Sequence, residues 1–360
     1  MQNWAMEIDR QDITKAQLVT PQRKDLRKSE VRLVIDRFAL TANNITYAAF
    51  GDAMRYWEFF PAGDSGRGRL PVWGFADIAE SRHPDLPVGD RIYGYFPAAS
   101  ELIVQPVKVS ASGFIDAAAH RAELPAPYNR YVRCAGDAGY GKDREAEQMV
   151  LQPLFLTGWL LARYLNAEKG FGARLVFLTS ASSKTAIGLA RSLSADNPHA
   201  VRIIGLTSPG SREFVSGLGC YDDVVTYPEI ADLPTGDASA IVDFAGDADI
   251  NRALHERLAD DLTANIRVGG AHWEQSAPAS DLPGPRPHFF FAPDHVQQAI
   301  AELGPEGFQS AYGAAWQDFA ASARDWLAFR EFEGAQACLD IYRRLIAGDA
   351  IARDGLTIRV

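Results

Sequence analysis

The second half of the sequence alternates short apolar runs with helical patterns, and this alternation restricts the fold more than any other feature. The apolar runs are LVFLT (175–179), VRIIGLT (201–207), DDVVTY (222–227), AIVDFAG (240–246), ANIRVGG (264–270) and HFFFA (288–292). Helical patterns separate several of them: TAIGLARSLSA, SREFVSGLG and ADINRALHERLADDL. Strands that alternate with helices form βαβ units around a buried parallel sheet. The sequence therefore predicts an α/β fold.

The first 110 residues have a different pattern, which is typical of β structure. VRLVIDRFAL (31–40) alternates apolar and polar residues, and RIYGYF (91–96) and ELIVQPVKV (101–109) are further predicted strands. An irregular insert at 51–70 is rich in aromatic residues. Such an insert either lines a pocket or is buried as a satellite core.

The tail of the chain continues with helical stretches and ends in a predicted strand. The helical stretches are GPEGFQSAYGAAWQDFAASARDW and AQACLDIYRRLIAG, and the strand is GLTIRV. This strand has no obvious partner nearby, so it could return to the first domain. We therefore predict a β-rich domain over 1–150, completed by 326–360, and an α/β domain over 151–325.

The segment TSASSKTAIG (179–188) lies between a predicted strand and a predicted helix, where α/β proteins bind phosphate. Three interpretations compete. A nucleotide-triphosphate loop would need glycine where Leu178 and Ser183 stand. A turn that only caps the helix, through Ser180 or Ser182, would bind no ligand. A dinucleotide turn would hold a pyrophosphate at the helix N-terminus. Its expected donors are Ser180, Ser182, Ser183, Lys184 and Thr185.

The segment GLTSPGSREF (205–214) favours a phosphorylated ribose. In a dinucleotide fold, an Asp or Glu about 20 residues past the turn accepts a hydrogen bond from a free ribose 2′-hydroxyl. Positions 204–211 contain neither, and the donors found there and next to them are Thr207, Ser208, Ser211 and Arg212. Hydroxyl donors and a fixed cation suit a 2′-phosphate, so we predict NADP(H) rather than NAD(H). The alternative is that Arg212 is a solvated residue in the first turn of a helix.

Charge and composition argue against several classes of function. The chain has 36 basic and 46 acidic residues and a net charge of −10, which disfavours binding to nucleic acid or to an anionic membrane surface. No apolar run approaches the roughly 20 residues needed to cross a bilayer, and MQNWAMEIDRQD is unlike a signal peptide. Cys134, Cys220 and Cys338 are widely spaced, as expected of a cytoplasmic protein without a disulfide framework.

The order of these segments resembles the medium-chain dehydrogenase/reductase superfamily, and within it the zinc-free quinone oxidoreductases and enoyl reductases. The resemblance covers most of the chain and implies a GroES-like β domain plus a Rossmann domain with a doubly wound parallel sheet. The matching segments are FALTANNITYAAFGD, LPVWGFADIAES, LPVGDRIYGYF, LQPLFLTGWLLARY, GARLVFLTSASSKTAIGLAR, IIGLTSPGSREFVSGLGCYDDVVTY and IVDFAGDADINRAL.

The sequence departs from this superfamily at two places, as a divergent subfamily would. The family's Gly-Gly-Val-Gly turn aligns on residues 182–185, which are Ser, Ser, Lys and Thr. Hydroxyls or Lys184 would have to replace the backbone contacts that glycine permits. The Cys and His set of the zinc-dependent members has no counterpart at ligand spacing, so we expect metal-independent chemistry.

The resemblance also implies roles for individual residues. Tyr47 matches the active-site Tyr by its Thr-Tyr-x-x-x-Gly setting, and a phenol can donate to a developing enolate. Asn43 and Asn44 precede it and would orient it or the substrate. The alternative is that Tyr47 packs in the core with its hydroxyl satisfied. The remaining assignments are Tyr56 and Trp57 in the substrate pocket, Thr157, Gly246, Gly269 and Gly270 on the cofactor side, and His272 as a structural residue.

From these features we predict an NADPH-dependent, metal-independent reductase that transfers hydride to a quinone, enone or related carbonyl compound. The partner would be a small-molecule substrate, and the resemblance implies a homodimer. One alternative is a non-catalytic NADP(H)-binding sensor or scaffold that keeps the fold. Another is an NADP-dependent enzyme for acyl carrier-linked substrates, which would need a basic docking patch.

Overall fold

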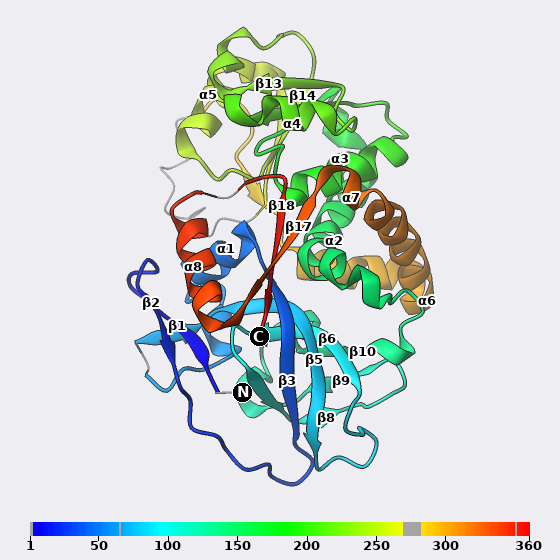
Figure 1. Ribbon diagram of the computed structural model, residues 1–360. Coiled ribbons are helices and arrows are strands. Elements are labelled where there is room, and N and C mark those ends of the chain that lie inside the picture. The colour runs from blue at the N-terminus through cyan, green and yellow to red at the C-terminus, as the bar shows by residue number, and fades with distance from the viewer. Residues whose placement is uncertain (1–2, 65, 269–281, 350) are drawn as a thin grey trace. The chain divides into compact units, whose positions relative to one another are not determined.

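The computed structural model describes residues 3–64, 66–268, 282–349 and 351–360. The chain divides into two compact units. The first unit is Met1–Val150 with Leu327–Val360, and the second is Leu151–Trp326. The first is dominated by β-strands and the second alternates strands with helices (Figure 1), so the predicted α/β fold class is confirmed.

The second unit is built around a six-stranded sheet in the order β13-β12-β11-β14-β15-β16. Every neighbouring pair in it is parallel. All residues of β11 and β14 are buried, as expected of central strands covered on both faces. The strands are β11 (Leu175–Leu178), β12 (Arg202–Thr207), β13 (Asp223–Thr226), β14 (Ser239–Asp243), β15 (Leu262–Arg267) and β16 (His288–Phe289).

The helices of the second unit precede, separate and follow these strands in sequence. They are α2 (Glu145–Ala167, in this unit from Leu151), α3 (Lys184–Ala195), α4 (Arg212–Gly217), α5 (Ala248–Leu258), α6 (Ala292–Ala321) and α7 (Ala323–Trp326), with the 3₁₀ turns η6 (Lys169–Gly172), η7 (Pro209–Ser211), η8 (Tyr227–Asp232) and η9 (Ala259–Asp261). Helix α6 begins well before the predicted helical stretch and is interrupted at Gly304, whose φ is 71°. Pro305 follows and disfavours helical geometry in the residue before it.

The first unit contains a nine-stranded and a three-stranded sheet. The larger sheet runs β17-β18-β3-β5-β6-β10-β9-β8, with β7 also paired to β3, and the smaller runs β2-β1-β4. The strands are β1 (Ala5–Asp9), β2 (Ala16–Val19), β3 (Val31–Leu40), β4 (Arg67–Arg69), β5 (Pro71–Ser81), β6 (Arg91–Pro97), β7 (Glu101–Val104), β8 (Pro106–Val107), β9 (Gly113–Asp116), β10 (Arg130–Arg133), β17 (Ala328–Glu333) and β18 (Asp354–Arg359). The helices and 3₁₀ turns are α1 (Ala42–Ala49), α8 (Gly334–Ile346), η1 (Tyr56–Glu58), η2 (Ala119–Arg121), η3 (Ala126–Asn129), η4 (Cys134–Gly136) and η5 (Lys142–Arg144).

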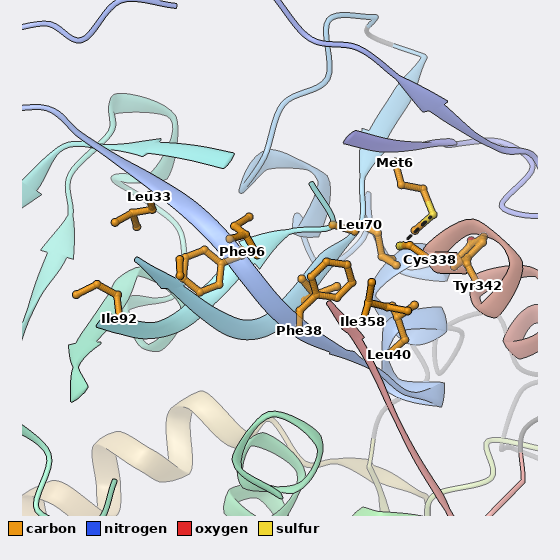
Figure 2. Packing of buried hydrophobic residues seen from close by; sticks show 14 of the residues in the cluster. Met6, Leu33, Phe38, Leu40, Leu70, Ile92, Phe96, Cys338, Tyr342 and Ile358 are labelled. Atoms are coloured by element: carbon orange, nitrogen blue, oxygen red, sulfur yellow. Dashed lines mark hydrogen bonds between the residues drawn. The ribbon is translucent and has the colours of Figure 1, made fainter. Parts of the chain in front are cut away.

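The C-terminal strand β18 pairs antiparallel with β3, and β17 pairs parallel with β18 (Figure 1). Helix α8 packs beside them with one buried face, which includes Cys338 and Tyr342. Figure 2 shows Cys338 facing Met6 of β1 in the core of this unit. The Tyr342 hydroxyl donates to the carbonyl of Ile13 at 2.7 Å. The last residues of the chain therefore complete the core that the first residues begin.

Helix α1, which the sequence pattern did not predict, begins with a capping box. The Asn44 side chain accepts from the backbone N–H of Thr41 at 2.7 Å, an arrangement that satisfies free donors at a helix start. The Asn44 amide also donates to the carbonyl of Pro71 at 2.8 Å. This helix sets the position of Tyr47, which lies one turn further on and is buried.

Charged side chains join the strands of the first unit to the start of α2. Arg91 donates to both carboxylate oxygens of Glu145 at 2.5 and 2.7 Å, and also pairs with Asp77 and Asp36. Tyr140 donates to Glu145 at 2.7 Å. Glu145 is buried, and these partners satisfy its carboxylate oxygens.

No helix among the described residues is long and apolar enough to cross a membrane.

Candidate functional site

The turn between β11 and α3 places several of the predicted phosphate donors together. Ser183 is the N-cap of α3, and its hydroxyl accepts from the N–H of Ala186 at 3.3 Å. The capping residue is therefore neither Ser180 nor Ser182, which the capped-turn interpretation had named. Ser180 has a φ of 47°, a left-handed conformation that glycine adopts more easily. The turn thus reaches a glycine-like geometry without glycine.

Two tyrosines brace this turn from the neighbouring part of the sheet. The backbone N–H of Ser180 donates to the Tyr227 hydroxyl at 3.0 Å, and the Tyr221 hydroxyl donates to the carbonyl of Ala181 at 2.8 Å. The N–H of Ala181 donates to Leu206 at 3.0 Å. The Ser180 and Ala181 amides therefore already have acceptors, and a phosphate would depend on other donors.

Those other donors lie one step further along the turn. Ser182 and Thr185 are half-buried, and within the described residues their hydroxyls have no hydrogen-bond partner. Lys184, also half-buried, is the first residue of α3. The start of a helix of this length is favourable for an anion, because its first N–H groups point outward. The hydroxyls of Ser182 and Thr185 add two neutral donors to that environment.

A buried polar network joins the carboxyl ends of β11, β14 and β15. The Thr179 hydroxyl donates to Asp243 at 2.7 Å and accepts from the N–H groups of Phe244 and Ala245. Asp243 also accepts from the N–H of Gly246 at 3.1 Å and pairs with Arg267. These bonds hold the strand ends at the edge where α/β sheets bind ligands.

The backbone conformation at position 246 favours glycine, whereas the neighbouring atoms would leave room for a side chain. Its φ is 65°, and a Cβ built there would meet no atom within 4 Å. The space in front of it is open, which leaves the backbone accessible.

The end of β12 gathers the donors predicted for a 2′-phosphate. Thr207 is buried, whereas Ser208 and Arg212 are exposed. The Ser208 hydroxyl donates to that of Ser211 at 3.3 Å. Arg212 is bound to Glu229: its Nη1 donates to both carboxylate oxygens at 2.7 and 3.0 Å. Arg212 is exposed and is the first residue of α4, as in the alternative of a solvated residue in the first turn of a helix, and its charge is paired with Glu229.

Two of the other cofactor-side residues, Thr157 and Gly246, lie in the part of the chain that the structure describes. Thr157 lies within α2, and its hydroxyl donates to the carbonyl of Pro153 at 3.5 Å. Its neighbour Gly158 permits α2 to approach α3, since a Cβ there would lie 2.6 Å from the backbone nitrogen of Leu189. Gly269, Gly270 and His272 lie outside the described residues.

In the first unit, Tyr47 lies inside a cluster of aromatic side chains. The cluster consists of Tyr47, Tyr56, Phe59, Phe60 and Tyr95 with Trp73 and Tyr128 packed against them. The Tyr47 hydroxyl accepts from Trp73 Nε1 at 3.3 Å, and Tyr128 packs against the same cluster. Burial raises the pKa of Tyr47 well above its ordinary value. The phenol therefore keeps its proton and remains a hydrogen-bond donor.

The two predicted pocket residues belong to different parts of this unit. The ring centroid of Tyr56 lies 4.6 Å from that of Tyr47, so Tyr56 is part of the aromatic cluster. Trp57 belongs to the main hydrophobic core. A Cβ at Gly51 or Gly68 would lie 2.0 or 2.2 Å from the Trp57 ring. The indole therefore fills the space that these two glycines leave.

Several residues of this arrangement were not predicted from the sequence. Glu229 follows Thr226 by three residues, a capping-box spacing that could have been recognised. Asp243 is an acidic residue at the end of an apolar run, which is a weaker signal. Trp73 and Tyr128 reach Tyr47 from distant segments, and no local pattern indicates that contact.

The residues that the structure describes contain no group of three or more His, Cys, Asp or Glu side chains placed to hold a metal ion.

Comparison with known proteins identifies one family and many similar folds. A family model described as protein of unknown function (DUF2855) matches residues 38–350. No curated protein matches the chain.

Among solved structures, the CurA protein from Vibrio vulnificus is 11% identical with a TM-score of 0.61, over 99% of this chain and 98% of that chain. The quinone oxidoreductase from Coxiella burnetii is 14% identical with a TM-score of 0.56, over 99% of both chains. The yhdH oxidoreductase from Salmonella enterica, solved in complex with NADP, is 12% identical with a TM-score of 0.52, over 99% of both chains. At these identities the similarity is one of fold. It confirms the predicted α/β fold class, a GroES-like β domain plus a Rossmann domain.

Proposed function

This chain belongs to the family described as protein of unknown function DUF2855, and we propose that it is an NADPH-dependent reductase that transfers hydride to a quinone, enone or related carbonyl compound without a metal. The observation that carries the proposal is the pair of donor groups at neighbouring strand ends of the second unit. One is the turn between β11 and α3, and the other is the group at the end of β12 that contains Arg212. The similar fold solved with NADP adds support.

The donors present fit a phosphorylated dinucleotide. Ser182, Thr185 and the N-terminus of α3 offer hydrogen bonds to a pyrophosphate. Arg212 and Ser208 offer a cation and a hydroxyl to a 2′-phosphate. Ser180 fits less well than its position in the motif predicts, because its N–H already donates to Tyr227. Ser183 is likewise occupied as the cap of α3.

When bound, NADPH supplies the hydride, and the residues of the chain bind and orient it and manage the proton. In this proposal Thr157 and Gly246 border the nicotinamide end. Asp243 and Thr179 act indirectly, because their hydrogen bonds hold the strand end that carries Gly246. The proposal includes a homodimer, as the resemblance implies, and a cytoplasmic location, as the three widely spaced cysteines indicate.

Tyr47 is the proposed proton donor to the substrate oxygen on which negative charge develops. Its raised pKa, caused first by burial, keeps the phenol protonated at neutral pH. Trp73 Nε1 donates to the phenol oxygen, and Asn43 lies one turn before Tyr47 in α1. Asn44 acts through α1, whose start it caps. Tyr56 packs against Tyr47 and shapes the aromatic surroundings.

Titration with NADPH and NADH, followed by turnover with a panel of quinones and enones, tests the proposal. Wild-type protein should bind NADPH more tightly than NADH, and Arg212→Ala should lose about 10–150-fold in NADPH affinity, the effect of one charge-assisted hydrogen bond. Arg202→Ala, at the opposite and exposed end of β12, is the matched control and should bind as wild type does. Equal affinity for both dinucleotides would rule out the proposed NADPH preference, and absence of binding would rule out the function.

A second candidate, an NADP(H)-binding protein without catalysis, is favoured by one specific observation. The Tyr47 side chain is buried within the aromatic cluster, where its hydroxyl accepts from Trp73 Nε1 at 3.3 Å. A phenol buried in this way must become accessible before it can donate to a substrate. Binding of NADPH without its oxidation by any member of a broad panel would favour this candidate.

A further inference from the structure

Glu229 is held in one orientation by the turn to which it belongs. It is the third residue of η8, and it accepts from the backbone N–H and the hydroxyl of Thr226 at 2.8 and 2.9 Å. These bonds form a capping box, so the carboxylate is anchored independently of any other partner.

The anchored carboxylate binds the cation that the proposed function assigns to a 2′-phosphate. Arg212 Nη1 donates to both oxygens of Glu229. In the described part of the chain, Nη2 and Nε of Arg212 have no hydrogen-bond partner. Arg212 therefore keeps donors for a phosphate, but a negative charge already lies against its guanidinium.

We propose that Glu229 is a specificity-determining residue that limits the preference for a 2′-phosphorylated dinucleotide over an unphosphorylated one. The inference rests on the proposed function. A 2′-phosphate that binds Arg212 approaches a fixed carboxylate of like charge, which repels it. An unphosphorylated ribose carries no such charge and is not repelled. Glu229 therefore changes the difference in affinity between the two cofactors rather than the affinity for both.

The carboxylate is charged at every pH at which the protein would work. The backbone hydrogen bond from Thr226, followed by those from Arg212 and the Thr226 hydroxyl, lowers the pKa of Glu229 to about 2. Both side chains are substantially exposed, at 50% for Arg212 and 41% for Glu229. Solvent screens their interactions, so the effect on selectivity should be modest.

The substitution Glu229→Gln tests the charge of this side chain separately from its role in the turn. Gln also serves as the third residue of a capping box, so the turn is retained while the charge is lost. The matched control is Glu213→Gln, an exposed acid that directly follows Arg212. The ratio of the dissociation constants of NADH and NADPH is measured by fluorescence titration for wild type and both variants, and thermal melting checks that each is folded.

We expect this ratio to rise about two- to fivefold in Glu229→Gln, the range for an exposed charge pair, and to stay at the wild-type value in Glu213→Gln. In an Arg212→Ala background, Glu229→Gln should change the ratio less, because the 2′-phosphate is no longer held by Arg212 beside the carboxylate. An unchanged or lower ratio in Glu229→Gln, or an equal rise in Glu213→Gln, overturns the inference but leaves the proposed function intact. A wild-type protein that binds neither dinucleotide overturns both.

Discussion

The Thr179 hydroxyl donates a 2.7 Å hydrogen bond to the Asp243 carboxylate and joins the carboxyl ends of two neighbouring parallel strands. Both side chains are almost fully buried, at 1% and 2% exposed. The same hydroxyl accepts from two backbone N–H groups, those of Phe244 and Ala245. One side chain therefore satisfies three polar groups of the segment that leads to Gly246.

Thr179→Val should destabilise the protein, because a methyl group replaces the acceptor of buried N–H groups. The expected loss is about 1–3 kcal/mol in the free energy of unfolding, measured by urea denaturation. Thr179→Ser keeps the hydroxyl and is the matched control, so it should lose less. Equal stability of the two variants would contradict the role of the hydroxyl.

Gly158→Ala should also be destabilising, because its Cβ would lie 2.6 Å from the backbone nitrogen of Leu189 and 2.9 Å from the carbonyl oxygen of Thr185. Backbone atoms cannot move aside cheaply, so α2 and α3 must separate, at a cost of about 1–3 kcal/mol. Gly313→Ala in α6 is the control, since a Cβ there meets nothing within 4 Å. That change should stabilise by about 0.4–1 kcal/mol. A Gly158→Ala protein with the wild-type melting temperature would show that the crossing tolerates a methyl group.

The free energy of unfolding should fall as the pH is lowered, because of the buried His255. This ring is fully buried; its Nδ1 bonds to the carbonyl of Pro283 at 2.7 Å, and Nε2 bonds to the amide nitrogen of Asn265 at 2.7 Å. A carbonyl only accepts and an amide nitrogen only donates, so the ring is neutral with its proton on Nδ1. Burial lowers the pKa of His255, and the opposing effects of the Pro283 hydrogen bond and the Asp243 charge are smaller.

The sign of the pH effect follows from this lowered pKa. The unfolded chain takes up the proton at about pH 6.5, whereas the folded protein does so only at lower pH. The stabilisation is therefore complete above about pH 6.5 and is lost as the pH falls toward the folded-state pKa. Urea unfolding at pH 7.5 and 5.5 should show a smaller loss in His255→Gln than in wild type. His199→Gln, at an exposed histidine, should follow wild type, and identical pH profiles for all three proteins would refute the prediction.

Tyr47→Phe should slow NADPH-dependent turnover by about 10²–10³-fold, the effect of losing one hydrogen-bond donor to a developing oxyanion. NADPH affinity should not change, because the substitution removes only the phenol oxygen in the first unit. Tyr342→Phe removes a hydroxyl that donates to Ile13 within the core and is the control for the same chemical change. A fully active Tyr47→Phe enzyme would show that water or another side chain donates the proton.

The sequence determined the elements of the second unit and the fold class. Runs such as LVFLT and AIVDFAG form buried parallel strands. They could be predicted because a short apolar run between two helical patterns is a local feature of the sequence. The short helix α1 was not predicted, since its start depends on a capping box that was not recognised in TANN. Local hydrogen-bonding signals of this kind are present in the sequence but are weaker than hydrophobic periodicity.

Only the tertiary structure decided which polar groups of the candidate site are still available to a ligand. The Ser180 N–H is taken by Tyr227, 47 residues away, and the Arg212 charge by Glu229, 17 residues away. The Tyr47 hydroxyl on α1 accepts from Trp73 on β5, 26 residues away. Residue type states what a side chain can donate or accept, but its partner depends on how distant segments pack. The sequence could therefore name the donors of the candidate site, whereas packing determined which of them are already bound to the protein itself.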